Sequence, residues 1–372
     1  MSSRSILLCS NYAWTVYNFR LPLLRSLKKN GYNIIILTQF DGYQNYLNHY
    51  SDTILPLNIS RMGLNPFREF STIINIFYVL LRYRPFCVLP FTLKPVLYCS
   101  FISKLLSINC IPMITGLGSA FLGSNKLRVL AIGLYKLFLN KVNFIIFQNI
   151  DDYRLFLRNK IVSKDVCKVS PGSGIDCSSF KFSQYNGDDQ HFRFLLIARM
   201  IADKGIREYI NASKMLSREF SDIEFHMIGP SRVQNRSAIK TSEIKKWQDD
   251  GIICYKGEVS SVQKFILNSS CVVLPSYREG TSRVLLEASA SGRPIITTNV
   301  PGCKEVVLDK KSGFLCKAKN SHDLYLKMKK MYLLDQGKRN EMGLVGRKHI
   351  EKNFSHRLVC QIYLDTLSNI NP

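Results

Sequence analysis

The chain has 372 residues, of which 46% are hydrophobic and 21% are charged. These values exclude a disordered chain, and the length suits two domains of roughly 150–200 residues, each with a core of its own. The formal net charge of +24 favours an anionic partner, which is a nucleic acid, a membrane surface or a polyanionic substrate.

The first half of the chain alternates strand-like and helix-like segments. In chain order, the pattern predicts strands at 6–10, 33–38, 86–90, 111–115 and 143–148, and helices at 21–30, 66–83, 95–106 and 126–140. Strands that alternate with helices at this spacing are typical of a doubly wound parallel sheet.

The stretch 70–150 is basic and contains no acidic residue. Its cations are Arg82, Arg84, Lys94, Lys104, Lys126, Arg128, Lys136 and Lys141. No groove-reading helix, zinc finger or stacking motif accompanies them, so we expect no nucleic-acid partner. An anionic membrane surface is the favoured partner, and the segment 126–140 is the favoured membrane-facing helix. A solvated basic surface with a buried apolar face is the alternative.

A second alternation follows a stretch rich in Gly, Ser, Asp and Asn at 170–190, which is typical of a linker. Strands are predicted at 192–198, 223–228, 252–255, 271–275 and 294–298, with helices between them and at 323–333, 338–353 and 356–368. The sequence therefore predicts α/β architecture with two Rossmann-like domains. A ligand is expected in the cleft between them, at the carboxyl ends of the strands.

The cysteines and the ends of the chain indicate the compartment. Eleven cysteines are scattered without a CxxC pair, which favours reduced, mostly buried thiols in a cytoplasmic protein over disulfides or a zinc site. The six histidines show no ligand spacing. The N-terminus lacks the features of a signal peptide, and no apolar stretch reaches the roughly 20 residues that span a bilayer.

The most specific stretch is 275–307. An apolar strand ends in the loop 276–280, and a helix is predicted to start around Thr281, so the backbone N–H groups of Gly280, Thr281 and Ser282 would face an anion. Glu279 precedes this helix, and Glu287 lies two turns into it, about 12 Å further on. That is the length of a diphosphate between a sugar and a ribose, whose hydroxyls the two carboxylates would bind. Two solvated glutamates on a surface helix are the alternative.

Two cations are predicted at the same edge of the second sheet. The strand 192–198 delivers Arg199 to the carboxyl edge, and Lys204 opens the following helix. There they can neutralise a diphosphate and stabilise the charge that builds as it leaves. Because the chain has no D-x-D motif, we expect no metal and no cofactor. Two solvated surface cations are the alternative for Arg199 and Lys204.

The segment 275–307 resembles the E-x7-E signature of family 4 glycosyltransferases, with Glu279 and Glu287 as the two acids. The stretches 17–24, 114–121, 147–152, 171–180 and 199–205 resemble the same family in the same order. The resemblance covers nearly the whole chain and is strongest to bacterial enzymes that elongate polyprenyl-diphosphate-linked saccharides for O-antigen, capsule or glycoprotein assembly.

The resemblance implies the GT-B fold, with an acceptor-binding domain at 1–180, a nucleotide-sugar-binding domain at 181–353 and a C-terminal helix, 354–372, that crosses back to the first domain. It also implies retaining, metal-independent transfer of a hexose or N-acetylhexosamine from a nucleotide-diphosphate sugar, UDP-linked by preference. The acceptor would be a lipid-linked saccharide, and the enzyme would lie peripherally on the inner face of the cytoplasmic membrane.

The same resemblance assigns the site residues. Catalysis falls to Glu279, Arg199 and Lys204. Donor binding falls to Glu287, Gly280, Thr281, Ser282, Gly229, Glu258, Val259, Thr115, Gly116 and Gly118, and acceptor binding to Asn18, Phe19 and Arg20. An N-terminal helix cap by Asn18 is an equal alternative. Thr115 departs from many relatives, which carry a histidine about there.

Two other functions remain open from the sequence. One is a sugar-nucleotide epimerase, which shares the two-domain fold and would convert the donor without an acceptor. The other is a basic protein that binds nucleic acid or membranes and has no affinity for nucleotide sugars.

Overall fold

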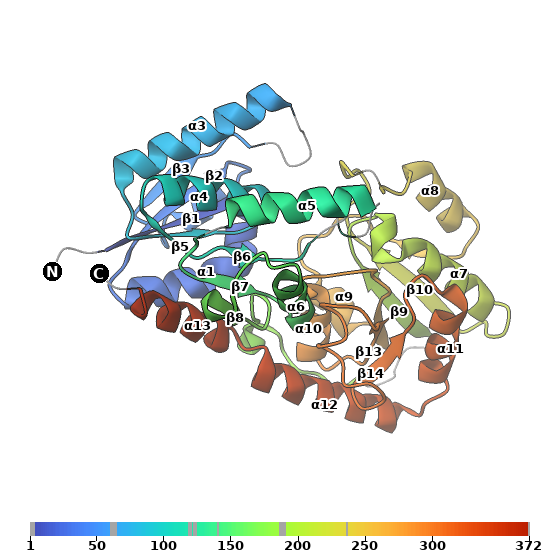
Figure 1. The fold of residues 1–372 in the computed structure, drawn as a ribbon. Helices are drawn as coiled ribbons and strands as arrows, with labels where there is room; N and C mark the ends of the chain where they lie inside the picture. The colour runs from blue at the N-terminus through green and yellow to red at the C-terminus, as the bar shows by residue number, and fades with distance from the viewer. Residues whose placement is uncertain are drawn as a thin grey trace. The chain divides into compact units, whose positions relative to one another are not determined.

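The computed structural model describes residues 4–59, 65–117, 121, 125–139, 141–185, 191–235 and 237–370. The chain divides into two compact units, the first formed by Met1–Gly174 with His356–Pro372 and the second by Ile175–Ser355 (Figure 1). The sequence placed the limits after residues 180 and 353. The first limit lies earlier because the Ile175 N–H donates to the Phe354 carbonyl at 2.8 Å and both side chains are buried in the second unit.

All strand pairs of the first unit are parallel. One sheet has the order β3-β2-β1-β4-β5 and another the order β6-β7-β8, and a bridge between Phe91 and Met113 links β4 to β6. The strands are β1 (Ser5–Tyr12), β2 (Asn33–Gln39), β3 (Thr53–Pro56), β4 (Cys87–Pro90), β5 (Asn109–Cys110), β6 (Met113–Ile114), β7 (Ile145–Phe147) and β8 (Cys167–Val169).

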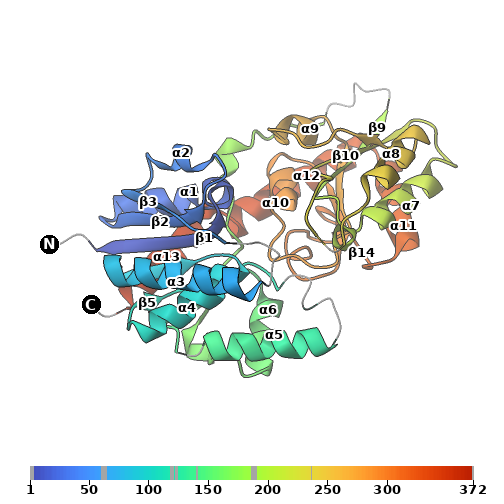
Figure 2. The same ribbon diagram turned by 90° about the horizontal axis from the view of Figure 1, so that it is seen from above.

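Helices cover both faces of the first sheet, and further helices pack on the sheet β6-β7-β8 (Figure 2). They are α1 (Ala13–Lys29), α2 (Gln44–Leu47), α3 (Pro66–Tyr83), α4 (Leu93–Leu105), α5 (Asn125–Phe138), α6 (Ile150–Arg158) and α13 (His356–Ser368). Side chains alternate along a strand, so Ile6 and Leu8 pack with α1 and α13, whereas Leu7 and Cys9 pack with α3 and α4. The last helix of the chain therefore completes the core of the first unit.

The second unit is a parallel sheet in the order β11-β10-β9-β12-β13-β14. Its strands are β9 (Phe192–Ile197), β10 (Ile223–Ile228), β11 (Cys254–Tyr255), β12 (Cys271–Leu274), β13 (Ile295–Thr298) and β14 (Gly313–Cys316). Its helices are α7 (Ile206–Leu216), α8 (Thr241–Asp249), α9 (Gln263–Leu267), α10 (Arg283–Ala290), α11 (Ser321–Tyr332) and α12 (Gln336–Asn353).

Two apolar clusters fill the second unit, one on each face of its sheet. Phe194 and Leu196 of β9 join the cluster of α7, α8 and α11, while Leu195 and Ile197 join that of α9, α10 and α12. Each unit is thus a helix-covered parallel sheet with cores of its own, which is the doubly wound class that the sequence predicted.

Some elements differ from the sequence-based expectation. The first helix begins at Ala13, well before residue 21, and contains Pro22. Its buried residues include Ala13 and Val16, so the apolar face that holds it to the sheet continues before the proline. A 3-10 turn at Ala202–Lys204, which the sequence did not predict, carries a candidate site residue. Every helix that the structure describes is too short or too polar to span a bilayer.

Candidate functional site

Two loops of the second unit are held together at the carboxyl ends of the neighbouring strands β9 and β12. The Tyr277 N–H donates to the Asp203 carbonyl at 2.9 Å, and the Ser276 hydroxyl donates to the same oxygen at 3.2 Å. Gly205 has φ +72°, and a Cβ on it would lie 2.1 Å from the Pro275 carbonyl oxygen. The close approach therefore requires glycine at this position.

These loops bring two predicted site residues into contact. The Lys204 ammonium forms an ion pair with the Glu279 carboxylate, and the two side chains are only 19% and 14% exposed. Water screens a pair at this depth less than it screens a surface pair. The sequence predicted Lys204 for the diphosphate and Glu279 for the hydroxyls of a neighbouring sugar, but it did not predict that the two residues pair.

A third loop, which follows β13, fixes the backbone around Glu279. The Glu279 N–H donates to the Pro301 carbonyl at 3.0 Å, and the Ser282 N–H donates to the Gly302 carbonyl at 2.9 Å. Gly302 has φ +78°, and a Cβ on it would lie 2.4 Å from the Glu279 carbonyl oxygen. The Glu305 carboxylate accepts from the Gly302 N–H at 2.8 Å and so holds this turn in place.

The helix α10 begins later than the sequence predicted. Its first residue is Arg283 and its N-cap is Ser282, whose side chain makes no capping bond. The start lies two residues after Thr281 because the Ser282 backbone is extended, with φ −71° and ψ 110°. The Ser282 N–H donates to the Gly302 carbonyl, so this N–H does not face an anion. Glu287 therefore lies little more than one turn into the helix, and the straight 12 Å helical offset from Glu279 does not apply.

Glu287 is mostly buried and is paired with Arg283, a partner that the sequence analysis did not predict. Its side chain is 13% exposed, and the Arg283 Nε donates to the carboxylate at 2.9 Å. Burial raises the pKa of Glu287, while the neighbouring Arg283 charge acts in the opposite direction. The i,i+4 spacing of the two residues was the available sequence signal.

The other predicted donor residues of the second unit follow the neighbouring strands. Arg199 comes just after β9 and is partly exposed. The Gly229 N–H, directly after β10, donates to the Gly257 carbonyl at 2.7 Å, so the ends of β10 and β11 are joined. Glu258 is exposed, whereas Val259 packs against the apolar cluster of α9 and α10. Parallel strands place all of these residues at one edge of the sheet with Lys204 and Glu279.

The predicted residues of the first unit lie on two elements. Thr115 and Gly116 follow β6 and are half-buried, with Gly116 at φ +116°, while Gly118 lies outside the described residues. Asn18 is exposed within α1, where its side-chain amide donates to the Trp14 carbonyl at 2.9 Å. The alternative of a helix cap by Asn18 is wrong, because α1 begins at Ala13 and Tyr12 is its N-cap.

Phe19 and Arg20 also lie within α1. Phe19 meets the Trp14 ring edge-on at 5.3 Å between centroids. Arg20 is 5% exposed, and its guanidinium lies 4.1 Å from the centre of the Phe91 ring. Arg20 is therefore a packed residue inside the first unit, and its role toward an acceptor stays a prediction.

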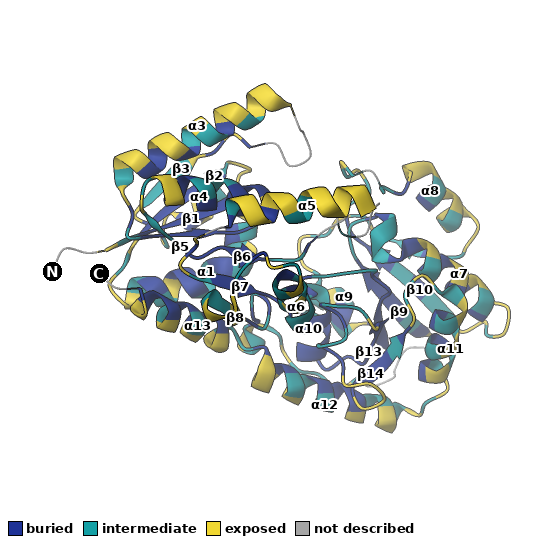
Figure 3. Cartoon of the chain, in the orientation of Figure 1, coloured by how far each residue is buried: buried dark blue, intermediate teal, exposed yellow. Residues whose placement is uncertain are grey.

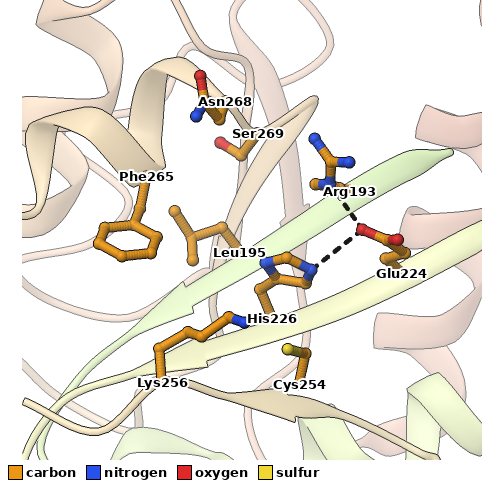
Figure 4. A pocket seen from close by; sticks show the side chains of 9 residues that line it. All are labelled: Arg193, Leu195, Glu224, His226, Cys254, Lys256, Phe265, Asn268 and Ser269. Carbon is orange, nitrogen blue, oxygen red and sulfur yellow. Dashed lines mark hydrogen bonds and ion pairs between the residues drawn. The ribbon is translucent and has the colours of Figure 1, made fainter. Parts of the chain in front are cut away.

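A separate cavity of about 380 Å³ lies on the second unit between α9 and the strands β9 to β11 (Figure 4). Arg193 and His226 both contact the Glu224 carboxylate, at 2.6 and 3.1 Å. Burial lowers the pKa of His226, while the neighbouring Glu224 charge acts in the opposite direction. None of the predicted site residues lines this cavity. Among the described residues, no three His, Cys, Asp or Glu side chains gather as a metal site.

Two protein families match the chain, one in each unit. Residues 179–349 match the family described as glycosyl transferases group 1, and residues 5–149 match the glycosyl transferase 4-like family. The first match contains Arg199, Lys204, Glu279 and Glu287, and the second contains Asn18 and Thr115. The predicted family resemblance is confirmed.

Among curated proteins, the chain is similar to an enzyme of Campylobacter jejuni, the N,N'-diacetylbacillosaminyl-diphospho-undecaprenol alpha-1,3-N-acetylgalactosaminyltransferase. The two are 26% identical over 327 residues, which are 83% of this chain and 84% of the enzyme. The capsular polysaccharide biosynthesis glycosyltransferase CapM of Staphylococcus aureus is 26% identical over 55% of this chain and 57% of its own length.

Two solved structures share the fold over nearly the full chain. A glycosyltransferase from Rickettsia africae has a TM-score of 0.79 at 18% identity, covering 100% of this chain and 99% of that one. Anabaena HepE in complex with UDP and glucose has a TM-score of 0.80 at 16% identity, covering 99% and 100%. The predicted fold class, with two Rossmann-like domains of the GT-B type, is thereby confirmed.

Proposed function

We propose, since the chain belongs to the group 1 and 4-like glycosyltransferases, that its second unit binds a nucleotide-diphosphate sugar at the loops after β9 and β12. The observation that carries the proposal is the ion pair of Lys204 with Glu279, which joins these loops. An ammonium has three donors, so Lys204 can keep Glu279 and also bind a phosphate oxygen.

The charge on the leaving diphosphate is the main obstacle to glycosyl transfer. Arg199 and Lys204 follow β9, and the amino-terminal end of α10 lies after β12, so three positive features stand at the carboxyl ends of adjacent strands. Positive groups held in advance at a developing charge lower the barrier without rearrangement. We propose that they replace a metal ion, and that transfer retains the anomeric configuration of the donor.

The two glutamates would hold the sugars on either side of the diphosphate. Glu279 is fixed by its backbone bond to Pro301 and by Lys204, and it would accept hydrogen bonds from the transferred sugar. Glu287 is fixed by Arg283 and would accept them from the ribose. Carboxylates that are already positioned lose little side-chain entropy on binding.

The relatives supply the classes of donor and acceptor. The Campylobacter enzyme is named for an N-acetylgalactosaminyl group and a diphospho-undecaprenol acceptor. HepE was solved with UDP and glucose. For this chain we propose a UDP-linked hexose or N-acetylhexosamine as donor and a lipid-linked saccharide as acceptor, in bacterial surface polysaccharide synthesis. The enzyme would then work at the inner face of the cytoplasmic membrane.

The proposal is tested by measuring nucleoside-diphosphate release from a panel of sugar nucleotides, in EDTA, with and without a polyprenyl-diphosphate saccharide. Lys204→Ala should lower the acceptor-dependent rate by about 100-fold or more, as the loss of one charge-stabilising donor does. Glu287→Ala should also lower it strongly, because the ribose loses its acceptor and Arg283 loses its partner. Lys214→Ala, which removes an exposed lysine from α7, is the matched control and should keep the wild-type rate.

Three outcomes would count against parts of the proposal. Full activity of both site variants, with unchanged circular dichroism, would remove the site assignment. Activity that disappears in EDTA and returns with a divalent cation would remove the metal-independent mechanism. Conversion of the donor sugar without any acceptor would favour the epimerase alternative.

A further inference from the structure

The helix α3 has two apolar faces. One face packs on the first unit through Thr72, Ile76, Val79 and Leu80. The opposite face is exposed and carries six large apolar side chains: Phe67, Phe70, Ile74, Phe77, Tyr78 and Leu81. Their spacing of three, four and seven residues places them on one side of the helix. Phe67 is 85% exposed and Phe70 65%, so this second stripe is not part of the core.

The helix α5 repeats the arrangement. Tyr135 is its one buried residue. Four exposed leucines recur at the same spacing on one side of the helix: Leu127, Leu130, Leu134 and Leu137. We call these four side chains and the six of α3 the α3–α5 surface.

The two stripes belong to one side of the first unit. The helix α4 packs against α3 and also against α5, where the Phe101 and Phe138 rings meet at 5.4 Å. Figures 1 and 2 both draw the three helices next to one another, and Figure 3 shows long exposed stretches on α3 and α5. Monomers that need no partner rarely expose so many large apolar side chains together.

The charges around this surface have one sign. Glu69 is the only acid on the two helices, and it is already bonded to Lys94 and Tyr98. Five exposed cations line the same helices: Arg68, Arg82, Lys126, Arg128 and Lys136. Within the described part of the chain, none of these five has an ion-pair partner.

We propose that the α3–α5 surface docks on an anionic lipid bilayer. Its apolar side chains enter the boundary between headgroups and acyl chains, and the five cations of the same helices lie at the lipid phosphates. A second copy of the chain fits less well, because two such surfaces would bring like charges together. The inference goes beyond the proposed reaction, since vesicle binding needs neither donor nor acceptor.

The full-length protein is sedimented with phosphatidylcholine vesicles that contain or lack phosphatidylglycerol. Binding to the anionic vesicles is expected, and it should weaken but persist when salt is raised from about 0.1 M to about 0.5 M, since salt screens charge but not apolar burial. The triple variant Phe67→Ser, Phe70→Ser, Phe77→Ser should bind at least about tenfold more weakly, because about 1.4 kcal/mol of lost apolar burial already gives tenfold.

The matched control is Leu326→Ser, Leu333→Ser, Leu344→Ser, which removes three exposed leucines from the second unit and should leave vesicle binding unchanged. Equal binding of wild type and the phenylalanine variant, or no binding of wild type to anionic vesicles, would overturn the proposal. So would a wild-type dimer in analytical ultracentrifugation that the phenylalanine variant abolishes. Because the phenylalanines are exposed, the variant should retain the wild-type fold by circular dichroism.

Discussion

At the scale of single residues, the charges of the candidate site are already paired inside the protein. Glu287 is held by Arg283, and Glu279 by Lys204. Burial raises the pKa of Glu287, so its carboxylate costs folding free energy at neutral pH. A group with a raised acid pKa stabilises the fold at low pH and loses that contribution as pH rises. A carboxylate kept at such a cost is typical of a functional site.

The raised pKa of Glu287 predicts the acidic limb of the activity profile. Donor hydroxyls bind the ionised carboxylate, so kcat/KM for the donor should fall as pH is lowered through that pKa. The Arg283 charge favours ionisation, and in Arg283→Gln burial acts unopposed. The limb should then move to higher pH in a pH–rate profile. Arg207→Gln, which removes an exposed partner of Glu243, should leave it in place. An unmoved limb in Arg283→Gln would contradict this assignment.

At the scale of elements, the site depends on three loops that hold one another at the carboxyl ends of β9, β12 and β13. Asp203 receives bonds from the Pro275–Gly280 loop, and the Gly302 turn lies against Glu279. Gly205, which lies against Pro275, and Gly302 both have a positive φ. The backbone of these loops therefore sets the distance between Lys204 and Glu279.

A methyl group on Gly205 should disturb the site through its contact with the Pro275 backbone. Gly205→Ala adds a Cβ about 2 Å from Pro275, so it should cost about 1–3 kcal/mol more than backbone strain alone and weaken UDP binding. Gly251→Ala has nearly the same φ but nothing within 4 Å, so it measures the strain alone. Chemical denaturation and calorimetric titration with UDP compare the two variants. Equal losses in both would show that the close contact does not matter.

Hydrophobic periodicity correctly predicted those helices and strands whose bounds are set by residues within the element itself. The helices 66–83 and 356–368 have the predicted bounds, and so does the strand 223–228. The helix α10 starts two residues after Thr281, because Ser282 has an extended backbone. Its N–H donates to the carbonyl of Gly302, a residue from a later loop that periodicity does not reveal. The sequence did not predict the burial of Arg20 either, because its neighbours Phe91 and Tyr363 come from distant segments of the chain. For α3, the period gave a helix but not the direction in which each apolar stripe faces.

At the scale of the whole molecule, the chain leaves the first unit at Gly174 and returns to it at His356. The returning helix α13 packs against α1 and contributes to the first unit's core. Its buried apolar residues in that core include Val359, Tyr363 and Leu367. The second unit, by contrast, is one continuous segment with two clusters of its own.

Truncation of one side chain on α13 should therefore destabilise the first unit. Leu367→Ala removes a side chain that is 1% exposed and should cost about 2–5 kcal/mol. Leu358→Ala, on the same helix but 43% exposed, should cost about 0.5 kcal/mol or less. Hydrogen exchange should place the loss of protection in 4–174 and not in 175–355. Comparable losses in the two variants would argue against a core role for α13.

The return of the chain also has a consequence for synthesis on the ribosome. Residues 1–174 emerge before the second unit, yet the helix that closes their core emerges only after the entire second unit. The second unit can fold as soon as it leaves the ribosome, while the earlier segments keep an open apolar seam along α1. A stalled or prematurely terminated chain would expose that seam, which makes it a substrate for chaperones and proteases.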